Sequence, residues 1–196
     1  MSLLPSRSEL SKHWILDPNI TFLNHGSFGA CPKLILDEQT KLRTSLESDP
    51  VTFMESTARE LWAESLVKLS KFINADSEGM TFVTNATSGV NTVLKSLDLK
   101  PNDEIIVLDH SYQACWNAVD SITKKTGAKT VVATIPFPID SNEQIIEEIL
   151  QKVTEKTRLV LVDTVTSPTG LRLPFEELVS ELQSRNVDVL LDAAHG

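Results

Sequence analysis

The fold of this chain is decided by the stretch RLVLVD at Arg158–Asp163, a short apolar run that ends in a carboxylate. Continuous runs of this kind, rich in Val, Ile and Leu, are typical of strands that are buried on both faces of a parallel sheet. Similar runs lie on either side of it. The further predicted strands are Met80–Val83, Glu104–Leu108, Thr130–Ile135 and Val187–Leu191.

Amphipathic segments with helical spacing separate these runs. Gly127 follows one of them in the position of a helix C-cap. Alternating strands and helices build a parallel sheet wrapped by helices, with right-handed crossovers. The sequence therefore predicts an α/β fold, a mostly parallel sheet flanked by helices. The predicted helices are Thr87–Leu97, Ser111–Lys125, Asn142–Val153 and Pro174–Ser184.

A different pattern precedes the alternating part. Prolines and glycines interrupt residues 1–32, which predicts an irregular N-terminal arm. Residues 33–75 show helical spacing with a break at Pro50, which predicts a helical lead-in. We therefore expect an arm over residues 1–32 and a large domain over 33–196, in which strands and helices alternate over 76–196.

Composition and charge narrow the class of partner. The net charge of −9 repels nucleic acid and anionic membranes, so neither is expected to bind. Cys31 and Cys115 are the only cysteines, and neither has a second Cys or a His at metal-binding spacing. We therefore expect no metal site and no disulfide framework. No long apolar stretch suggests a signal peptide or a membrane span, so a cytoplasmic location is expected.

Polar residues follow four of the five predicted strands. In an open parallel sheet, ligands bind outside the carboxyl ends of the strands. Each cluster alone is explained well by helix capping, but the set favours a shared ligand. The clusters are Thr84–Gly89, Asp109–Tyr112, Asp163–Gly170 and Asp192–His195.

The first cluster has the character of an anion site. Small residues turn a strand into a helix, whose free N–H groups and dipole attract negative charge, and Thr87 and Ser88 add hydroxyl groups. The segment has neither a Walker lysine nor the glycine spacing of a dinucleotide fingerprint. A monophosphate is the ligand that this pattern favours.

The last cluster contains a carboxylate that needs a cation. Asp192 ends an apolar run, so it is expected to be buried, and a buried charge requires a partner. No Lys or Arg occurs in the six residues before it or anywhere after it. A cationic ligand would supply the charge, and His195 stands close enough in sequence to add a ring contact or a hydrogen bond.

The ordered set of motifs resembles the class V aminotransferases, in particular the isopenicillin-N-epimerase-like branch with its cysteine-desulfurase-like and sulfoxide-lyase-like members. The similarity runs from about Phe22 to the end of the sequence. It rests on Phe22–Gly29, Phe82–Asn91, Asp109–Tyr112, Asp163–Gly170 and Leu191–Gly196.

This resemblance implies the cofactor pyridoxal 5'-phosphate (PLP). By residue matching, Asp192 resembles the carboxylate that keeps the pyridine nitrogen protonated, and Tyr112 resembles the aromatic residue that stacks on the ring, with His110 as the alternative. The other matched residues resemble the phosphate loop (Ala86, Thr87, Ser88), the surroundings of the ring hydroxyl (Ser167, His195) and the arm that faces the substrate (Asn24, Ser27).

Two departures from the family pattern stand out. Thr164 occupies a position where many relatives of this branch have His, which leaves the substrate open. The lysine that forms the Schiff base in this family follows the Asp-x-x-His segment, and no lysine follows Asp192 here. The resemblance therefore implies an N-terminal half that lacks the Schiff-base lysine and the small C-terminal domain, with His195 as a possible catalytic residue.

By resemblance, the chain belongs to an enzyme that acts on an amino acid through a carbanion at Cα, as an epimerase, a C–S lyase or an aminotransferase. The same resemblance implies a homodimer in the full-length form. Two alternatives remain at this point: a non-catalytic module that binds PLP or another phosphate ligand or assembles with a partner, and an α/β enzyme for another phosphorylated ligand.

Overall fold

The computed structural model describes residues 7–196, so the first six residues of the predicted arm lie outside the described part. The described part of the chain forms two compact units, residues 7–81 and residues 82–196. The first holds the predicted arm and helical lead-in, and the second holds the sheet.

The sheet of residues 82–196 has four strands in the order β2-β1-β3-β4, and every neighbouring pair is parallel. This arrangement confirms the predicted α/β class. Because all the strands run the same way, their carboxyl ends meet at one edge. The strands are β1 (Glu104–Leu108), β2 (Lys129–Ala133), β3 (Thr157–Asp163) and β4 (Asp188–Asp192).

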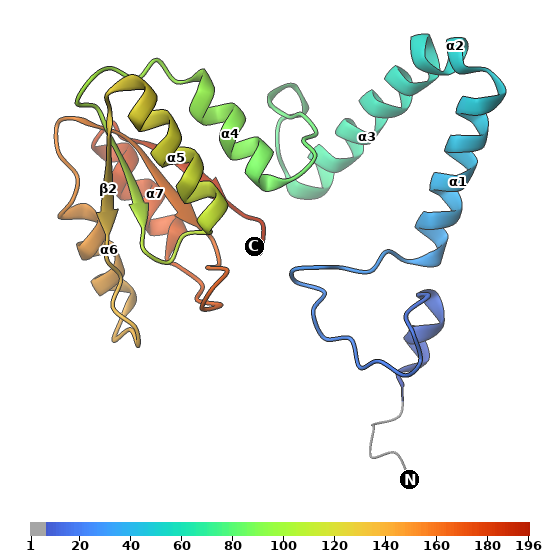
Figure 1. The fold of residues 1–196 in the computed structure, drawn as a ribbon, viewed down its shortest axis with the longest axis horizontal. Helices are drawn as coiled ribbons and strands as arrows, with labels where there is room; N and C mark the ends of the chain where they lie inside the picture. Colours follow the sequence, from blue (N-terminus) through green and yellow to red (C-terminus); the bar gives the residue numbers. More distant parts are fainter. Residues whose placement is uncertain (1–6) are drawn as a thin grey trace. The chain divides into compact units, whose positions relative to one another are not determined.

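Helices cover both faces of this sheet (Figure 1). Successive side chains of a strand point to opposite faces, so Ile105 and Leu161 pack under α4 and α5, while Ile106 and Val160 pack under α6 and α7. All four side chains are 0% exposed. Burial on both faces of the sheet explains why these strands appear in the sequence as uninterrupted apolar runs. The helices are α4 (Ala86–Ser96), α5 (Gln113–Thr126), α6 (Asn142–Leu150) and α7 (Phe175–Ser184).

Helix α5 ends as the sequence predicts. Gly127 adopts the left-handed conformation, with φ of 79°, and its N–H donates to the carbonyl of Thr123. A residue with a side chain would be strained at this φ, so glycine suits the position. The chain can then turn directly into β2.

One predicted strand is wrong. The segment Met80–Val83 belongs to no β-ladder in the described sheet. Met80 itself has extended backbone angles, as its apolar neighbours favour, but a strand also needs a neighbouring backbone to bond with. Strand propensity therefore predicted the extended backbone of Met80 but not whether the segment pairs with a neighbouring strand.

Residues 7–81 are mainly helical, as predicted for the lead-in. Helix α1 (Lys33–Ser48) stops before Pro50, where Asp49 caps the short α2 (Pro50–Thr52) by accepting from the N–H of Thr52. A π-helical turn, Phe53–Thr57, then leads into α3 (Ala58–Ile73). Short 3-10 turns lie at Glu9–His13 and Ser77–Gly79. None of the helices described is long and apolar enough to span a bilayer.

Candidate functional site

The carboxyl edge of the sheet brings two buried aspartates together. Parallel pairing of β3 and β4 places Asp163 directly opposite Asp192. Paired residues on neighbouring strands send their side chains to the same face, and Asp163 and Asp192 are only 4% and 5% exposed. The prediction that Asp192 is buried is therefore confirmed, and a second carboxyl group lies beside it.

Asp192 is held by two hydrogen bonds and by no protein cation. Its Oδ1 accepts from the N–H of Ala194 at 3.1 Å, and its Oδ2 accepts from the thiol of Cys115 at 3.2 Å. No Lys, Arg or His in the described residues forms an ion pair with it. The carboxylate is thus oriented and partly stabilised, but no cation of the described residues balances its charge.

Cys115 is the side-chain donor to this carboxylate. The thiol lies on α5 and is 1% exposed. Burial, followed by the hydrogen bond to Asp192, raises the pKa of the Cys115 thiol to about 12, while a hydrogen bond from Thr87 acts in the opposite direction. The thiol therefore stays protonated at neutral pH and serves as a hydrogen-bond donor to Asp192.

The N-terminus of α4 presents free N–H donors. Asn85 caps the helix by accepting from the N–H of Ser88 at 2.8 Å, and the Ser88 hydroxyl lies 3.0 Å from that of Thr84. Within the described residues, no hydrogen bond takes the N–H groups of Ala86 and Thr87. Two such N–H groups at the positive end of a helix dipole suit an anion.

Asp163 is a second buried carboxyl group at this edge, and the sequence pattern alone assigned no role to it. Its Oδ2 has no hydrogen-bond partner among the described residues. Burial raises the pKa of the Asp163 carboxyl, and the nearby Asp192 adds to the rise, although hydrogen bonds from the Ser111 hydroxyl and the Tyr112 N–H oppose it. The signal in the sequence that could have pointed to Asp163 is that it directly ends an apolar run, as Asp192 does.

The two candidates for ring stacking differ in their surroundings. Tyr112 precedes α5 and is 45% exposed, so it is not packed in the core. His110 lies with its Nδ1 3.2 Å from the hydroxyl of Thr169, and its ring meets the edge of Phe137 at 5.9 Å between centroids. His110 therefore has partners within the protein, whereas the Tyr112 side chain is available.

The remaining predicted residues are all exposed. Ser167 lies in the turn after β3 and His195 in the segment after β4, so both follow strand ends. Asn24 and Ser27 belong to the other compact unit, and their position relative to the sheet is not defined.

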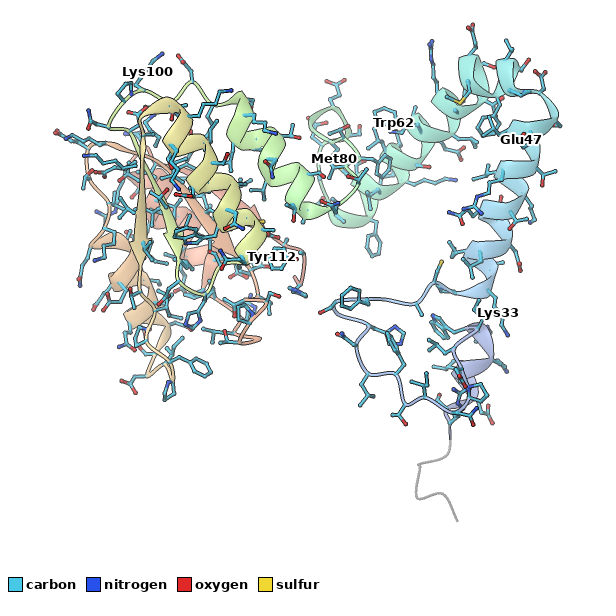
Figure 2. All side chains as sticks on the ribbon, in the orientation of Figure 1. Lys33, Glu47, Trp62, Met80, Lys100 and Tyr112 are labelled. Carbon is cyan, nitrogen blue, oxygen red and sulfur yellow. The ribbon has the colours of Figure 1, made fainter. Side chains whose placement is uncertain are left out.

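The lysines of residues 82–196 lie away from this edge. Lys129 begins β2 and Lys156 precedes β3, which places both at the amino ends of strands. Lys100 precedes β1, and Figure 2 shows it at the opposite end of the sheet from Tyr112. Lys124 and the other helical lysines are exposed. No lysine of this unit therefore occupies the carboxyl edge.

The comparisons with known proteins identify the family of this chain. The family profile described as aminotransferase class-V matches residues 32–196, which is most of the chain. The protein belongs to this family, and the predicted resemblance is confirmed.

The curated relatives of this chain are named for different reactions. A hercynylcysteine sulfoxide lyase of Schizosaccharomyces pombe is 28% identical over 95% of this chain and 48% of the relative. An isopenicillin N epimerase of Amycolatopsis lactamdurans is 30% identical over 91% of this chain and 46% of the relative. The chain thus spans about half the length of the curated relatives it matches.

Solved structures support the fold. The complex of the cystine C–S lyase C-DES with its product cysteine persulfide superposes with a TM-score of 0.79 at 24% identity, over 91% of this chain and 48% of that one. The apo cysteine desulfurase of Thermococcus onnurineus NA1 gives a TM-score of 0.78 at 18% identity, over 98% and 48%. At these identities the likeness shows the architecture alone.

Proposed function

We propose that this chain is part of a PLP-dependent enzyme that acts on an amino acid, and that the carboxyl edge of its sheet binds the cofactor. One observation carries the proposal: a helix N-terminus with free N–H groups, on α4, belongs to the same packed layer as a buried carboxylate that pairs with no cation of the described residues. A ligand that is anionic at one end and cationic at the other matches both features, and phosphate and pyridinium give PLP these two charges.

The residues present fit this cofactor. The N–H groups of Ala86 and Thr87, with the Ser88 hydroxyl, would hold the phosphate. Asp192 would accept a charge-assisted hydrogen bond from the ring nitrogen, and Tyr112 would offer its ring face for offset stacking. Ser167 and His195, which also follow strand ends, would lie near the ring hydroxyl.

When bound, PLP supplies an electron sink for bonds at the substrate Cα. The proposed role of this chain is to keep the ring nitrogen protonated, and the buried carboxylate of Asp192 would serve that role. Cys115 donates to Asp192 Oδ2 and so fixes the carboxylate orientation. Because the Cys115 thiol has its pKa raised to about 12, it adds no competing charge at neutral pH.

The substrate proposal is an amino acid, with C–S cleavage, epimerisation and amino transfer as the candidate reactions. It is supported by the relatives, which are named as a sulfoxide lyase, an epimerase and an L-cysteine desulfhydrase. Asn24 and Ser27 are proposed to contact the substrate, with His195 as the proposed proton-transfer group. We also propose a cytoplasmic homodimer, as in the expectation from the sequence.

The test is cofactor binding and turnover by the full-length protein with Asp192 altered. Losing a charge-assisted hydrogen bond of roughly 1.5–3 kcal/mol weakens binding by about 10- to 150-fold, so Asp192→Ala should lose PLP on dialysis. Asp192→Asn keeps the shape without the charge, so it should retain more PLP yet turn over slowly. The matched control is Asp188→Asn, which alters an exposed carboxylate at the other end of β4.

Near-normal turnover in Asp192→Asn would contradict the proposed role. PLP binding without any amino-acid turnover by the full-length protein would instead favour a binding module.

Borohydride reduction gives a second test. The lysine that attaches PLP covalently is proposed to lie outside residues 82–196, because the lysines of this unit do not reach the carboxyl edge. Reducing the full-length protein with bound PLP and mapping the label by mass spectrometry should therefore identify no lysine of this unit. Stoichiometric labelling of Lys129 or Lys156 would show that the ligand edge has been misassigned.

A further inference from the structure

Asp163 is a second buried carboxyl group at the carboxyl edge of the sheet, and the proposed PLP site gives it no contact with the cofactor. Asp163 is 4% exposed, and its Oδ2 has no hydrogen-bond partner in the described residues. An ionised carboxylate oxygen in such a place is strongly disfavoured. A protonated carboxyl group costs far less to bury, because it carries no charge.

The neighbour of Asp163 makes this requirement stronger. Asp163 and Asp192 are register partners on adjacent parallel strands, which lie about 4.8 Å apart. Two carboxylates sharing a buried site repel each other, so one of them keeps a proton well above the ordinary carboxyl range. The described residues supply no lysine, arginine or histidine paired with either aspartate to offset the second charge.

The hydrogen bonds indicate which carboxyl keeps the proton. Both oxygens of Asp192 accept hydrogen bonds, from Ala194 and Cys115, and these stabilise a charge. Asp163 also has donors near it, namely the Ser111 hydroxyl and the N–H groups of Tyr112 and of Asp163 itself, but within the described residues its Oδ2 receives no hydrogen bond. The raised pKa of Asp163, caused first by burial, agrees with this assignment.

We propose that Asp163 is a charge-setting residue of the cofactor site: it stays protonated beside ionised Asp192, so that the buried pair carries one negative charge and accepts one monocation. The inference rests on the proposed function for the identity of that cation, the pyridinium ring.

In this arrangement Asp163 positions charge and does not react. If Asp163 were ionised, the site would hold two negative charges for one pyridinium, and the excess would be unbalanced. Asn has nearly the shape of a protonated Asp and is always neutral, so Asp163→Asn should reproduce the working state. Asp192→Asn should not, because it removes the charge that the cation needs.

The first arm of the test reads the proton without any cofactor. Infrared spectra of the cofactor-free full-length protein at neutral pH should show the carbonyl stretch of a protonated carboxyl group, shifted by carbon-13 labelling of aspartate. Asp163→Asn should abolish this band, and Asp188→Asn, which alters an exposed carboxylate on β4, should leave it unchanged. Absence of the band in the wild type, or its persistence in Asp163→Asn, would overturn the proposal.

The second arm measures PLP affinity by equilibrium dialysis at neutral pH. Asp163→Asn should bind within about threefold of the wild type, whereas loss of more than tenfold in this folded variant would show that Asp163 binds as an anion. If Asp163→Asn does not fold, Asp163→Ser, which is also neutral, replaces it in both arms. If no protein binds PLP, the proposed function fails, while the infrared result still decides the protonation of Asp163.

Discussion

The sheet of residues 82–196 and the helices of residues 7–81 both follow from apolar patterns in the sequence, but their apolar side chains end in different environments. Leu161 in β3 is 0% exposed, because α4 and α5 close its face of the sheet. Leu34 in α1 is 74% exposed and Phe72 in α3 is 86% exposed, and α1 buries no residue at all. Periodicity is thus enough to form an amphipathic helix, but burial needs a partner surface.

The two units therefore differ in how much their apolar side chains gain from burial. The strands of the sheet gain most from burial, since their side chains lie between two helical layers. The helices α1 and α3 gain less within their own unit, where Leu66 is the one large apolar residue of α3 that is fully buried. Substitutions in the two regions should therefore have unequal effects.

The largest effect is expected from emptying the core of the sheet. Leu161→Ala removes a fully buried side chain and should lower the free energy of unfolding by about 2–5 kcal/mol. The matched change Leu34→Ala, on an exposed helix position, should stay within about 0.5 kcal/mol. Urea denaturation of the full-length protein measures both, and an equally large loss at Leu34 would show that α1 is covered by another part of the protein.

A smaller effect is expected at the end of α5. Alanine at Gly127 must adopt φ of 79°, which costs roughly 1–2 kcal/mol. Its new Cβ would meet Pro101 at ordinary contact distance, so sterics add little. Gly26→Ala, in the other unit, meets nothing within 4 Å and should be nearly neutral. Thermal denaturation compares the two, and equal stabilities would argue against a strained cap.

The smallest expected effect is on how the free energy of unfolding depends on pH. The two units should show this dependence with opposite sign. The pKa of Asp163 is raised by burial, so the folded state holds a proton that the unfolded state has lost, and stability falls as pH rises from about 4. The pKa of exposed Asp49 is lowered by its hydrogen bonds with Thr52, so its contribution is instead lost as pH falls.

Removing each charge should change the slope accordingly. Asp163→Asn should flatten the loss of stability above pH 4, by at most about 1.4 kcal/mol per pH unit. Asp49→Asn should act only at low pH and with the opposite sign. Denaturation of the cofactor-free protein across pH measures both slopes, and parallel curves for Asp163→Asn and the wild type would show that Asp163 has an ordinary pKa.

The sequence was sufficient for the features that depend on local pattern. Four of the five predicted strands and the helices between them were found close to their predicted bounds, because two-sided burial leaves a continuous apolar run. The burial of Asp192 followed from the same run. Met80–Val83 failed because strand pairing depends on a neighbour that no local pattern specifies.

The sequence was not sufficient for contacts between distant residues. The hydrogen bond from Cys115 to Asp192 joins positions 77 residues apart, and a lone cysteine in a helix gives no signal of it. The pairing of Asp163 with Asp192 required the strand order β1-β3-β4, which the linear sequence does not state. The roles of Ala86, Ser88, Tyr112 and the other site residues remain predictions.

A structure of the full-length protein with PLP bound tests the central claim most directly. The account predicts the ring nitrogen roughly 2.7–2.9 Å from a carboxylate oxygen of Asp192, the phosphate at the N-terminus of α4, and the ring face against Tyr112 with His110 still bonded to Thr169. A ring nitrogen directed away from Asp192, or a phosphate bound by another element, would contradict it.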